Sequence, residues 1–271
     1  MAKLPKKTLT QQIDAVNIED YPRGHLGASV IGDPCKRKIA YSFYWASKTK
    51  IAARLNRIFR LGDDIEEQII KALNTVGLEV TGQQDKISDR TGHAGGSCDG
   101  IITNHPDFDE PILFEAKSAN HNNFLEIKRK GVQESKPTHY TQMNMYMGRL
   151  GLRFALYAVY NKNNSELHFE LIPFDEDCFK DAEITEHDVL FMQHINSFPR
   201  ISTNPSWYHC KTCDHQNVCQ RGERPARNCR TCERSEMHSD GVWYCSFNET
   251  NLDRDAQIAG CHHYELGPEW K

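Results

Sequence analysis

A short apolar run that carries two charged residues constrains this chain more than any other feature of its sequence. The run PILFEAKS (111–118) begins with Ile112, Leu113 and Phe114 and so predicts a buried strand. Successive side chains of a strand point to opposite faces, so Glu115 and Lys117 share one face and Ala116 points to the other. Alternating charges on a strand usually form a solvated face, so the pair needs support from other segments.

An aspartate upstream supplies the first such support. Asp99 lies in GGSCDGII (95–102), and strand alternation would place it on the side of Ser97 and opposite Cys98. Two carboxylates on adjacent strands can hold one or two Mg²⁺ or Mn²⁺ ions through oxygen ligands. A neighbouring lysine can polarise the attacking water or stabilise charge on a phosphate. Asp followed by Glu-x-Lys is therefore the residue set of a metal-dependent phosphodiesterase.

Two helical patterns flank these strands. In RIFRLGDDIEEQIIKAL (57–73) apolar residues recur every four positions and predict an amphipathic helix, at Leu61, Ile65, Ile69 and Leu73. Glu66 lies on this helix, four residues after Gly62. In HYTQMNMYMGRLG (139–151), Gln142 and Tyr146 are four residues apart and share one helical face.

The ordered set Gly-x-x-x-Glu, Asp, Glu-x-Lys, Gln-x-x-x-Tyr resembles the PD-(D/E)XK nucleases of the RecB type. That group includes the AddB nuclease domain, CRISPR adaptation nucleases and many phage exonucleases, and the resemblance covers roughly residues 25–220. It implies an α/β restriction-endonuclease-like core, which is a mixed central sheet flanked by helices. The family often carries His at the position of Glu66, where glutamate is an accepted variant.

The resemblance also implies roles. Asp99 and Glu115 would bind Mg²⁺ or Mn²⁺, with the backbone carbonyl of Ala116 as a further ligand, while Glu66 would hold a second ion or its water. Lys117 would position the nucleophile. Gln142 and Tyr146 would orient the DNA backbone or the lysine.

The leading functional expectation is a metal-dependent deoxyribonuclease of the phage DNA-processing or recombination type, with exonuclease action on DNA ends or single strands favoured over endonuclease action. A recombination or single-strand-binding protein is the expected partner, and the cytoplasm of a bacterial host is the expected location. Two alternatives come from other classes. The chain could be a non-catalytic nuclease fold that binds DNA or a CRISPR adaptation complex, or a zinc-held interaction module with accidental motifs.

Ten cysteines point to bound metal. The N-terminus lacks the apolar region of a secretory signal, and no apolar run is long enough to span a membrane. In a chain expected to be intracellular, clustered cysteines bind metal more often than they form disulfides. Three follow the core as C-x2-C-x5-C and one lies far upstream: Cys210, Cys213, Cys219 and Cys35. By resemblance to the iron–sulfur staple of AddB-type nucleases, these four bind a [4Fe–4S] cluster. In the alternative, Cys35 is a small buried residue and the other three bind zinc with His209 or His215.

A second cysteine group occupies the C-terminal segment. Cys229, Cys232, Cys245 and Cys261 supply four soft ligands and predict a tetrahedral zinc site, in which His262 or His263 could replace the last cysteine. The aromatic residues Trp243, Tyr244 and Phe247 are expected to pack around it. Cys98 and Cys178 are expected to be structural. The expected division is an N-terminal arm (1–24), a nuclease core closed by the four-cysteine site (25–220) and a zinc-binding tail (221–271).

Charge is distributed unevenly along the chain. The net charge is −4, but residues 1–60 hold 12 Lys or Arg against 4 Asp or Glu. Basic residues between 36 and 60 alternate with Tyr41, Phe43, Tyr44 and Trp45, which suits either a nucleic-acid groove with stacking rings or an amphipathic helix with an aromatic core face. Lys128, Arg129 and Lys130 are also expected near phosphate. Helices are expected over 36–47, 51–75 and 176–197, and strands over 78–87, 93–103, 111–118, 153–162 and 166–174.

Overall fold

A mixed five-stranded sheet forms the centre of the molecule. The computed structural model describes residues 8–16, 22–48 and 53–271. The sheet order is β2-β5-β6-β7-β8, and only the β6–β7 pair is parallel. The strands are β2 (Val80–Thr81), β5 (Gly100–Ile102), β6 (Ile112–Ala119), β7 (Phe154–Asn161) and β8 (Leu167–Pro173). The predicted mixed α/β architecture is confirmed at this level.

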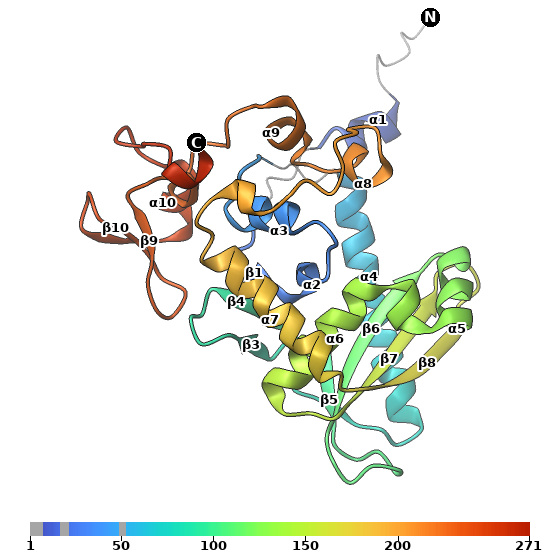
Figure 1. Cartoon of the computed structure of the whole chain (residues 1–271). Helices are drawn as coiled ribbons and strands as arrows, with labels where there is room; N and C mark the ends of the chain where they lie inside the picture. Colours follow the sequence, from blue (N-terminus) through green and yellow to red (C-terminus); the bar gives the residue numbers. More distant parts are fainter. Residues whose placement is uncertain (1–7, 17–21, 49–52) are drawn as a thin grey trace, which may run out of the picture.

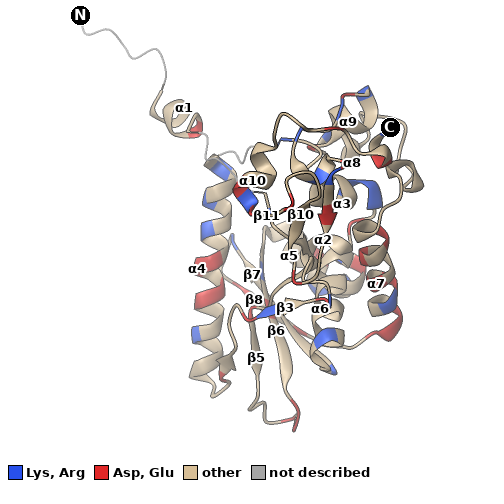
Figure 2. Ribbon diagram, turned by 90° about the vertical axis from the view of Figure 1, so that its left-hand side faces the viewer, with Lys and Arg blue, Asp and Glu red and all other residues tan. Residues whose placement is uncertain are grey.

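Helices cover both faces of this sheet, and strand alternation decides which β6 side chains meet which layer. Helix α4 (Ala53–Thr75) packs on one face, where Ile69 contacts the layer of Ile112 and Phe114. Helices α5 (His121–Ser135), α6 (Pro137–Leu150) and α7 (Glu176–Leu190) lie on the other side (Figures 1 and 2). Leu113 and its alternating neighbours on β6 face this second layer, so Glu115 and Lys117 point toward α6.

A smaller sheet lies beside the N-terminal segment. Strand β1 (Leu26–Gly27) pairs in parallel with β4 (Ala94–Ser97), which pairs antiparallel with β3 (Lys86–Ser88). Three helices belong to the same N-terminal region: α1 (Leu9–Asp14), α2 (Ala28–Ile31) and α3 (Lys36–Phe43). Helix α1 lies within the arm predicted over 1–24, whose residues 1–7 and 17–21 fall outside the described part of the chain.

The C-terminal segment is built from short elements that share the main core. They are α8 (Tyr208–Lys211), α9 (Gln216–Arg221), β9 (Ser235–Met237), β10 (Trp243–Cys245), β11 (Thr250–Leu252), α10 (Arg254–Ala259) and 3₁₀ turns at Ile195–Ser197, Cys229–Thr231 and Pro268–Trp270. Trp243 and Trp270 are buried against Tyr44. Trp243 therefore packs into the core of the whole molecule, whereas the sequence predicted it around a zinc site.

Several predicted boundaries are wrong for local reasons. The strands expected over 78–87 and 93–103 are each split between the two sheets, because a turn with positive φ at Gly82 and Gln84 separates β2 from β3 and a break at Asp99 separates β4 from β5. The helix expected over 36–47 ends at Phe43, since Trp45 has a φ of 54°. The helix expected over 176–197 ends at Leu190.

The expectation of a basic groove with stacking rings is wrong. Tyr41, Phe43, Tyr44 and Trp45 are all buried, so they form the aromatic core face of the alternative interpretation. Arg37 is buried as well and donates to the carbonyl oxygen of Phe198 at 2.7 Å. Lys50, part of the same prediction, lies outside the described residues.

Two further surface predictions also differ. The Lys128 ammonium pairs with Glu166 and the Lys130 ammonium with Glu126 and Glu134, away from the cleft described below. Leu61, expected on the apolar stripe of α4, is 45% exposed, because the buried cluster between α4 and the sheet begins at Ile65. None of the described helices is long and apolar enough to cross a membrane.

Candidate active site

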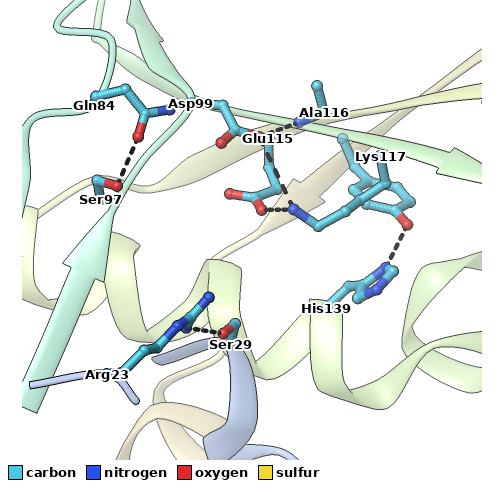
Figure 3. A network of polar contacts seen from close by, with 10 residues as sticks. Arg23, Ser29, Gln84, Ser97, Asp99, Glu115, Ala116, Lys117 and His139 are labelled. Carbon is cyan, nitrogen blue, oxygen red and sulfur yellow. Dashed lines mark hydrogen bonds and ion pairs between the residues drawn. The ribbon is translucent and has the colours of Figure 1, made fainter. Parts of the chain in front are cut away.

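Asp99, Glu115 and Lys117 meet where β5 pairs with β6. Gly100 is opposite Phe114 in this antiparallel pair, so Asp99 is carried to the level of the Glu-x-Lys segment. Its Oδ2 accepts a hydrogen bond from the backbone N–H of Ala116 at 2.8 Å. The Lys117 ammonium donates to Oε1 of Glu115 and lies 3.9 Å from Oδ2 of Asp99 (Figure 3). Asp99 is therefore positioned by the hydrogen bond from the Ala116 N–H, and not by its alternation along one unbroken strand.

The carboxylates of Asp99 and Glu115 lie in a largely buried site beside the Lys117 ammonium group. The Glu115 side chain is 0% exposed, and its Oε2 has no hydrogen-bond partner among the described residues. Burial, with repulsion from Asp99, raises the pKa of Glu115 to about 7 against the opposing effect of Lys117. Burial also raises the pKa of Asp99. For Lys117, burial lowers the pKa, but the two carboxylates outweigh it and hold the pKa above its usual value, so the ammonium group stays charged.

Glu66 of α4 joins this group from the edge of the sheet. Burial, with Asp99 as the next cause, raises the pKa of Glu66 to about 7, while Lys117 and a hydrogen bond with Gln84 oppose the rise. Oε1 of Gln84 accepts from the Ser97 hydroxyl at 2.9 Å (Figure 3). Glu66 is therefore electrostatically coupled to Asp99 and Lys117.

One face of α6 closes over the strand residues. His139, Gln142 and Tyr146 lie at spacings of three and four residues and all line the same cleft. The Tyr146 hydroxyl lies so close to β4 that a Cβ added at Gly96 would be 2.3 Å from it. Nδ1 of His139 is 2.7 Å from the hydroxyl of Tyr157, the β7 neighbour of Glu115. Burial, followed by Lys117 and Lys136, lowers the pKa of His139 to about 4, so its imidazole is neutral at pH 7.

The cleft has a volume of about 950 Å³, and Lys117, Arg23, His25 and Lys86 are among the residues that line it. Arg23 and Lys86 both act electrostatically on His25, and these three residues are called the basic wall below. Arg23 donates to the Ser29 hydroxyl at 2.9 Å, and this pair faces Glu115 and Lys117 across the cleft (Figure 3). An ammonium and a guanidinium group on opposing walls suit a polyanion lying between them.

Sequence reasoning missed Arg23, Ser29, Gln84 and His139. The spacing of His139 three residues before Gln142 was available as a signal, because both fall on one helical face. Nothing in the sequence indicated Arg23, since the chain path that brings it to the cleft depends on the small sheet and on the tail.

The cysteines of the first predicted group converge. Cys35, Cys210, Cys213 and Cys219 line one small cavity together with His209 and Lys38. Burial raises the pKa of Cys210 and Cys213, and Cys35 is a further cause for both. His215 points elsewhere: its Nε2 is 3.0 Å from the Ser42 hydroxyl.

The second group converges too. Cys229, Cys232, Cys245 and Cys261 line a cavity of about 120 Å³ with Phe247 and His263. Burial, followed by the three neighbouring thiols, raises the pKa of Cys229 to about 11. Within 8–16, 22–48 and 53–271, however, no three His, Cys, Asp or Glu side chains form a group that could hold a metal ion as they stand.

Comparison with solved structures finds exonucleases and a further protein, SSO0001, at low sequence identity. The alkaline exonuclease LHK-Exo from Laribacter hongkongensis is 19% identical, with a TM-score of 0.48 over 62% of this chain and 87% of that one. Its complex with dAMP gives 18% and 0.47, over 62% and 86%. The protein SSO0001 gives 15% and 0.46, over 73% and 86%. A phage-related exonuclease from Haemophilus somnus 129PT gives 15% and 0.36, over 47% and 66%.

No protein-family model and no curated protein matches the chain. At these identities and TM-scores, function has to be argued from the site itself.

Proposed function

We propose that this protein is a metal-dependent nuclease that hydrolyses phosphodiester bonds of DNA. The observation that carries the proposal is the convergence of Asp99 and Glu115 on Lys117, which lines a cleft that Arg23 and Lys86 also line. Two carboxylates beside one lysine suit phosphoryl chemistry, in which charge on the scissile phosphate must be balanced.

The donor set fits a divalent cation. Oε2 of Glu115 is a buried carboxylate oxygen without a hydrogen-bond partner among the described residues, and burial, with repulsion from Asp99, raises the pKa values of Glu66 and Glu115 to about 7. Asp99 and Glu115 would hold Mg²⁺ or Mn²⁺, with the Ala116 carbonyl as a further ligand and Glu66 binding a second ion or its water. Mg²⁺ is commonly bound by one or two carboxylates and keeps several waters, so three converging acidic side chains are not required. Such an ion would supply charge neutralisation and an activated water.

The protein groups divide the remaining work. Lys117 stays protonated, so it serves as an electrostatic stabiliser and orients the nucleophile, and it cannot act as a general base. Gln142 and Tyr146 line the same cleft as Lys117 and would orient the DNA backbone. Arg23 and Lys86 of the basic wall would bind backbone phosphates, for which a guanidinium group offers paired donors.

We further propose that the two cysteine cavities hold metal. Cys35, Cys210, Cys213 and Cys219 would bind a [4Fe–4S] cluster, or zinc at the same thiols, and Cys229, Cys232, Cys245 and Cys261 would bind zinc. The soft thiolates suit both groups, and four of them around each cavity support the assignment. The thiols would adjust their positions on binding, since metal association and local folding are coupled.

A nuclease assay with two DNA substrates tests the proposal. Purified protein is incubated with end-labelled linear duplex and with covalently closed circular DNA, in Mg²⁺, in Mn²⁺ and in chelator. We expect release of nucleotides from linear DNA that requires metal, with circular DNA resistant, as for an exonuclease acting at ends. Cleavage of the circle would indicate an endonuclease, while DNA binding without cleavage in either metal would contradict the catalytic assignment.

A further inference from the structure

A buried arginine in the tail connects the C-terminal segment to the cleft. Arg230 is 2% exposed and lies between Cys229 and Cys232. Its guanidinium donates three hydrogen bonds to oxygens of three different segments: Gln257 Oε1 at 2.9 Å, the Phe43 carbonyl at 2.8 Å and the Gly24 carbonyl at 2.7 Å.

These partners stabilise a buried cation without a carboxylate. The guanidinium lies 3.8 Å from the ring centroid of Trp45, and the rings of Phe43 and Trp243 lie at 5.2 and 4.9 Å. Burying a charge is costly unless its hydrogen bonds are satisfied. The three carbonyl-type acceptors must therefore stay in place, and one of them is the backbone of Gly24.

The segment that contains Gly24 is held at three successive carbonyls. Arg254 of α10 donates to the carbonyl oxygen of Pro22, the Trp45 indole donates to that of Arg23 at 3.0 Å, and Arg230 donates to that of Gly24. This segment forms no helix or strand of its own before β1. Two of its three fixed carbonyls are thus held by the tail, and its Arg23 side chain lines the cleft.

The tail also holds the turn between β3 and β4, which contributes Gly92 to the lining of the cleft. The backbone N–H of Gly241 donates to the carbonyl oxygen of Thr91 at 2.8 Å, and His93 donates to that of His238 at 2.7 Å. Gly92 has a φ of 74°, and a Cβ there would be 2.5 Å from the Gly241 nitrogen, so the two backbones touch. Gly92 itself lines the cleft.

We propose that the cysteine-rich tail positions the basic wall of the cleft, and that Arg230 is the positioning residue that sets Arg23 to bind a DNA phosphate. The ligand in this inference, a DNA phosphate, rests on the proposed nuclease function. The three hydrogen bonds that hold the carbonyls of Pro22, Arg23 and Gly24, called the clamp below, do not depend on that function. Arg230 touches no substrate in this scheme and acts only through the backbone that carries Arg23.

Three variants of the full-length protein test the clamp. Arg230→Met removes the hydrogen bonds at similar side-chain length, and Arg23→Ala removes the phosphate ligand. Arg234→Met is the matched control, because Arg234 is a tail arginine that pairs with Glu265 and stacks on Phe247 away from the segment. Measured quantities are binding of a labelled duplex as a function of salt, kcat and KM for its cleavage, and the rate of tryptic cleavage after Arg23, followed by mass spectrometry.

We expect Arg230→Met to weaken DNA binding about tenfold and to reduce the salt slope by about one, as loss of one phosphate contact does. The value of kcat at saturating DNA should stay within about twofold. Arg230→Met added to Arg23→Ala should cost little more than Arg23→Ala alone, because both act on one contact. Tryptic cleavage after Arg23 should accelerate in Arg230→Met and remain at the wild-type rate in Arg234→Met.

Additive losses in the double variant, or folded Arg230→Met with wild-type DNA binding and tryptic rate, would overturn the proposal. If Arg230→Met does not fold, Trp45→Phe and Arg254→Met are tested instead, since each removes one of the other two carbonyl contacts. Each should weaken DNA binding and accelerate tryptic cleavage after Arg23. Wild-type DNA binding and a wild-type tryptic rate in both variants would equally overturn the proposal. A wild-type protein that neither binds nor cleaves DNA would refute the nuclease function, and the tryptic rates would still decide whether Arg230 fixes the segment.

Discussion

At the scale of single residues, Glu115 is a carboxylate held in a fully buried site. It lies beside Asp99, the Lys117 ammonium lies beside both carboxylates, and Oε2 of Glu115 has no hydrogen-bond partner in the part of the chain that the structure describes. Such an arrangement is unfavourable for stability by itself, because a buried charge needs a partner for each of its polar atoms. A divalent cation bound by Glu115 would resolve the imbalance.

Replacing this carboxylate separates chemistry from folding. We expect Glu115→Gln to lower the cleavage rate by about 10³-fold or more, because groups that act as one catalytic unit are lost together. The fold should survive, since the amide has the same shape and can still accept from Lys117. The measurement is cleavage in Mg²⁺ beside thermal unfolding, with Glu166→Gln on an exposed ion pair as the control. Wild-type cleavage by Glu115→Gln would show that the site is elsewhere.

His139 predicts how stability depends on pH. Its pKa is lowered from 6.5 to about 4, so the unfolded chain takes up a proton before the folded one does. The stabilising contribution is therefore present above pH 6.5 and is lost as pH falls through 4, by about 3 kcal/mol for a shift of this size. In His139→Gln, which can still bond Tyr157, the free energy of unfolding should fall less steeply over this range. Denaturant unfolding at pH 7, 5.5 and 4.5 measures it, and parallel curves for both proteins would contradict the expectation.

At the scale of elements, the contact between β4 and α6 fixes the cleft. Gly96→Ala would place a methyl group against the Tyr146 hydroxyl and should destabilise the protein by about 1–3 kcal/mol through overpacking, with Tyr146 displaced. Tyr146→Phe removes the clashing oxygen, so the double variant should be more stable than Gly96→Ala alone. Chemical denaturation of the four proteins gives the coupling energy. Additive effects would mean that Gly96 is not needed for the approach of Tyr146.

The elements also show what the sequence could and could not predict. The sheet centre was predictable because the apolar pattern of β6 is continuous, and the shared face of Glu115 and Lys117 follows from alternation alone. The position of Asp99 in the break between two strands was not, since its carboxylate accepts a hydrogen bond from the backbone N–H of Ala116 on another strand. The burial of Tyr41 and Trp45 depends on tail residues that contact them, Trp270 and Asn228, and the position of Arg23 depends on its backbone contact with Trp45.

At the scale of the whole molecule, the two cysteine cavities lie at places where distant segments meet. Cys35 precedes α3, while Cys210, Cys213 and Cys219 belong to the α8–α9 region some 180 residues later in the chain. The second cavity lies within the tail whose Trp243 and Arg230 reach the main core. Metal in either cavity would therefore stabilise long-range contacts, because binding free energy adds to folding free energy wherever the ligands come together only in the folded state.

Cys35→Ser and Cys232→Ser should each remove the metal of one cavity and leave the other loaded. We expect each variant to lose about 3 kcal/mol or more, which corresponds to a decrease in Tm of roughly 10 °C for a chain of this size. Cys98→Ser is the control, since Cys98 is buried away from both cavities and bonds only weakly to the Gly82 carbonyl. Iron and zinc content are measured beside thermal unfolding for each purified protein.

Because Arg230 lies between Cys229 and Cys232, loss of metal in Cys232→Ser should also loosen the clamp on Gly24 and weaken DNA binding, whereas Cys35→Ser should leave the clamp intact. Full metal content in either variant would remove that cysteine from the ligand set.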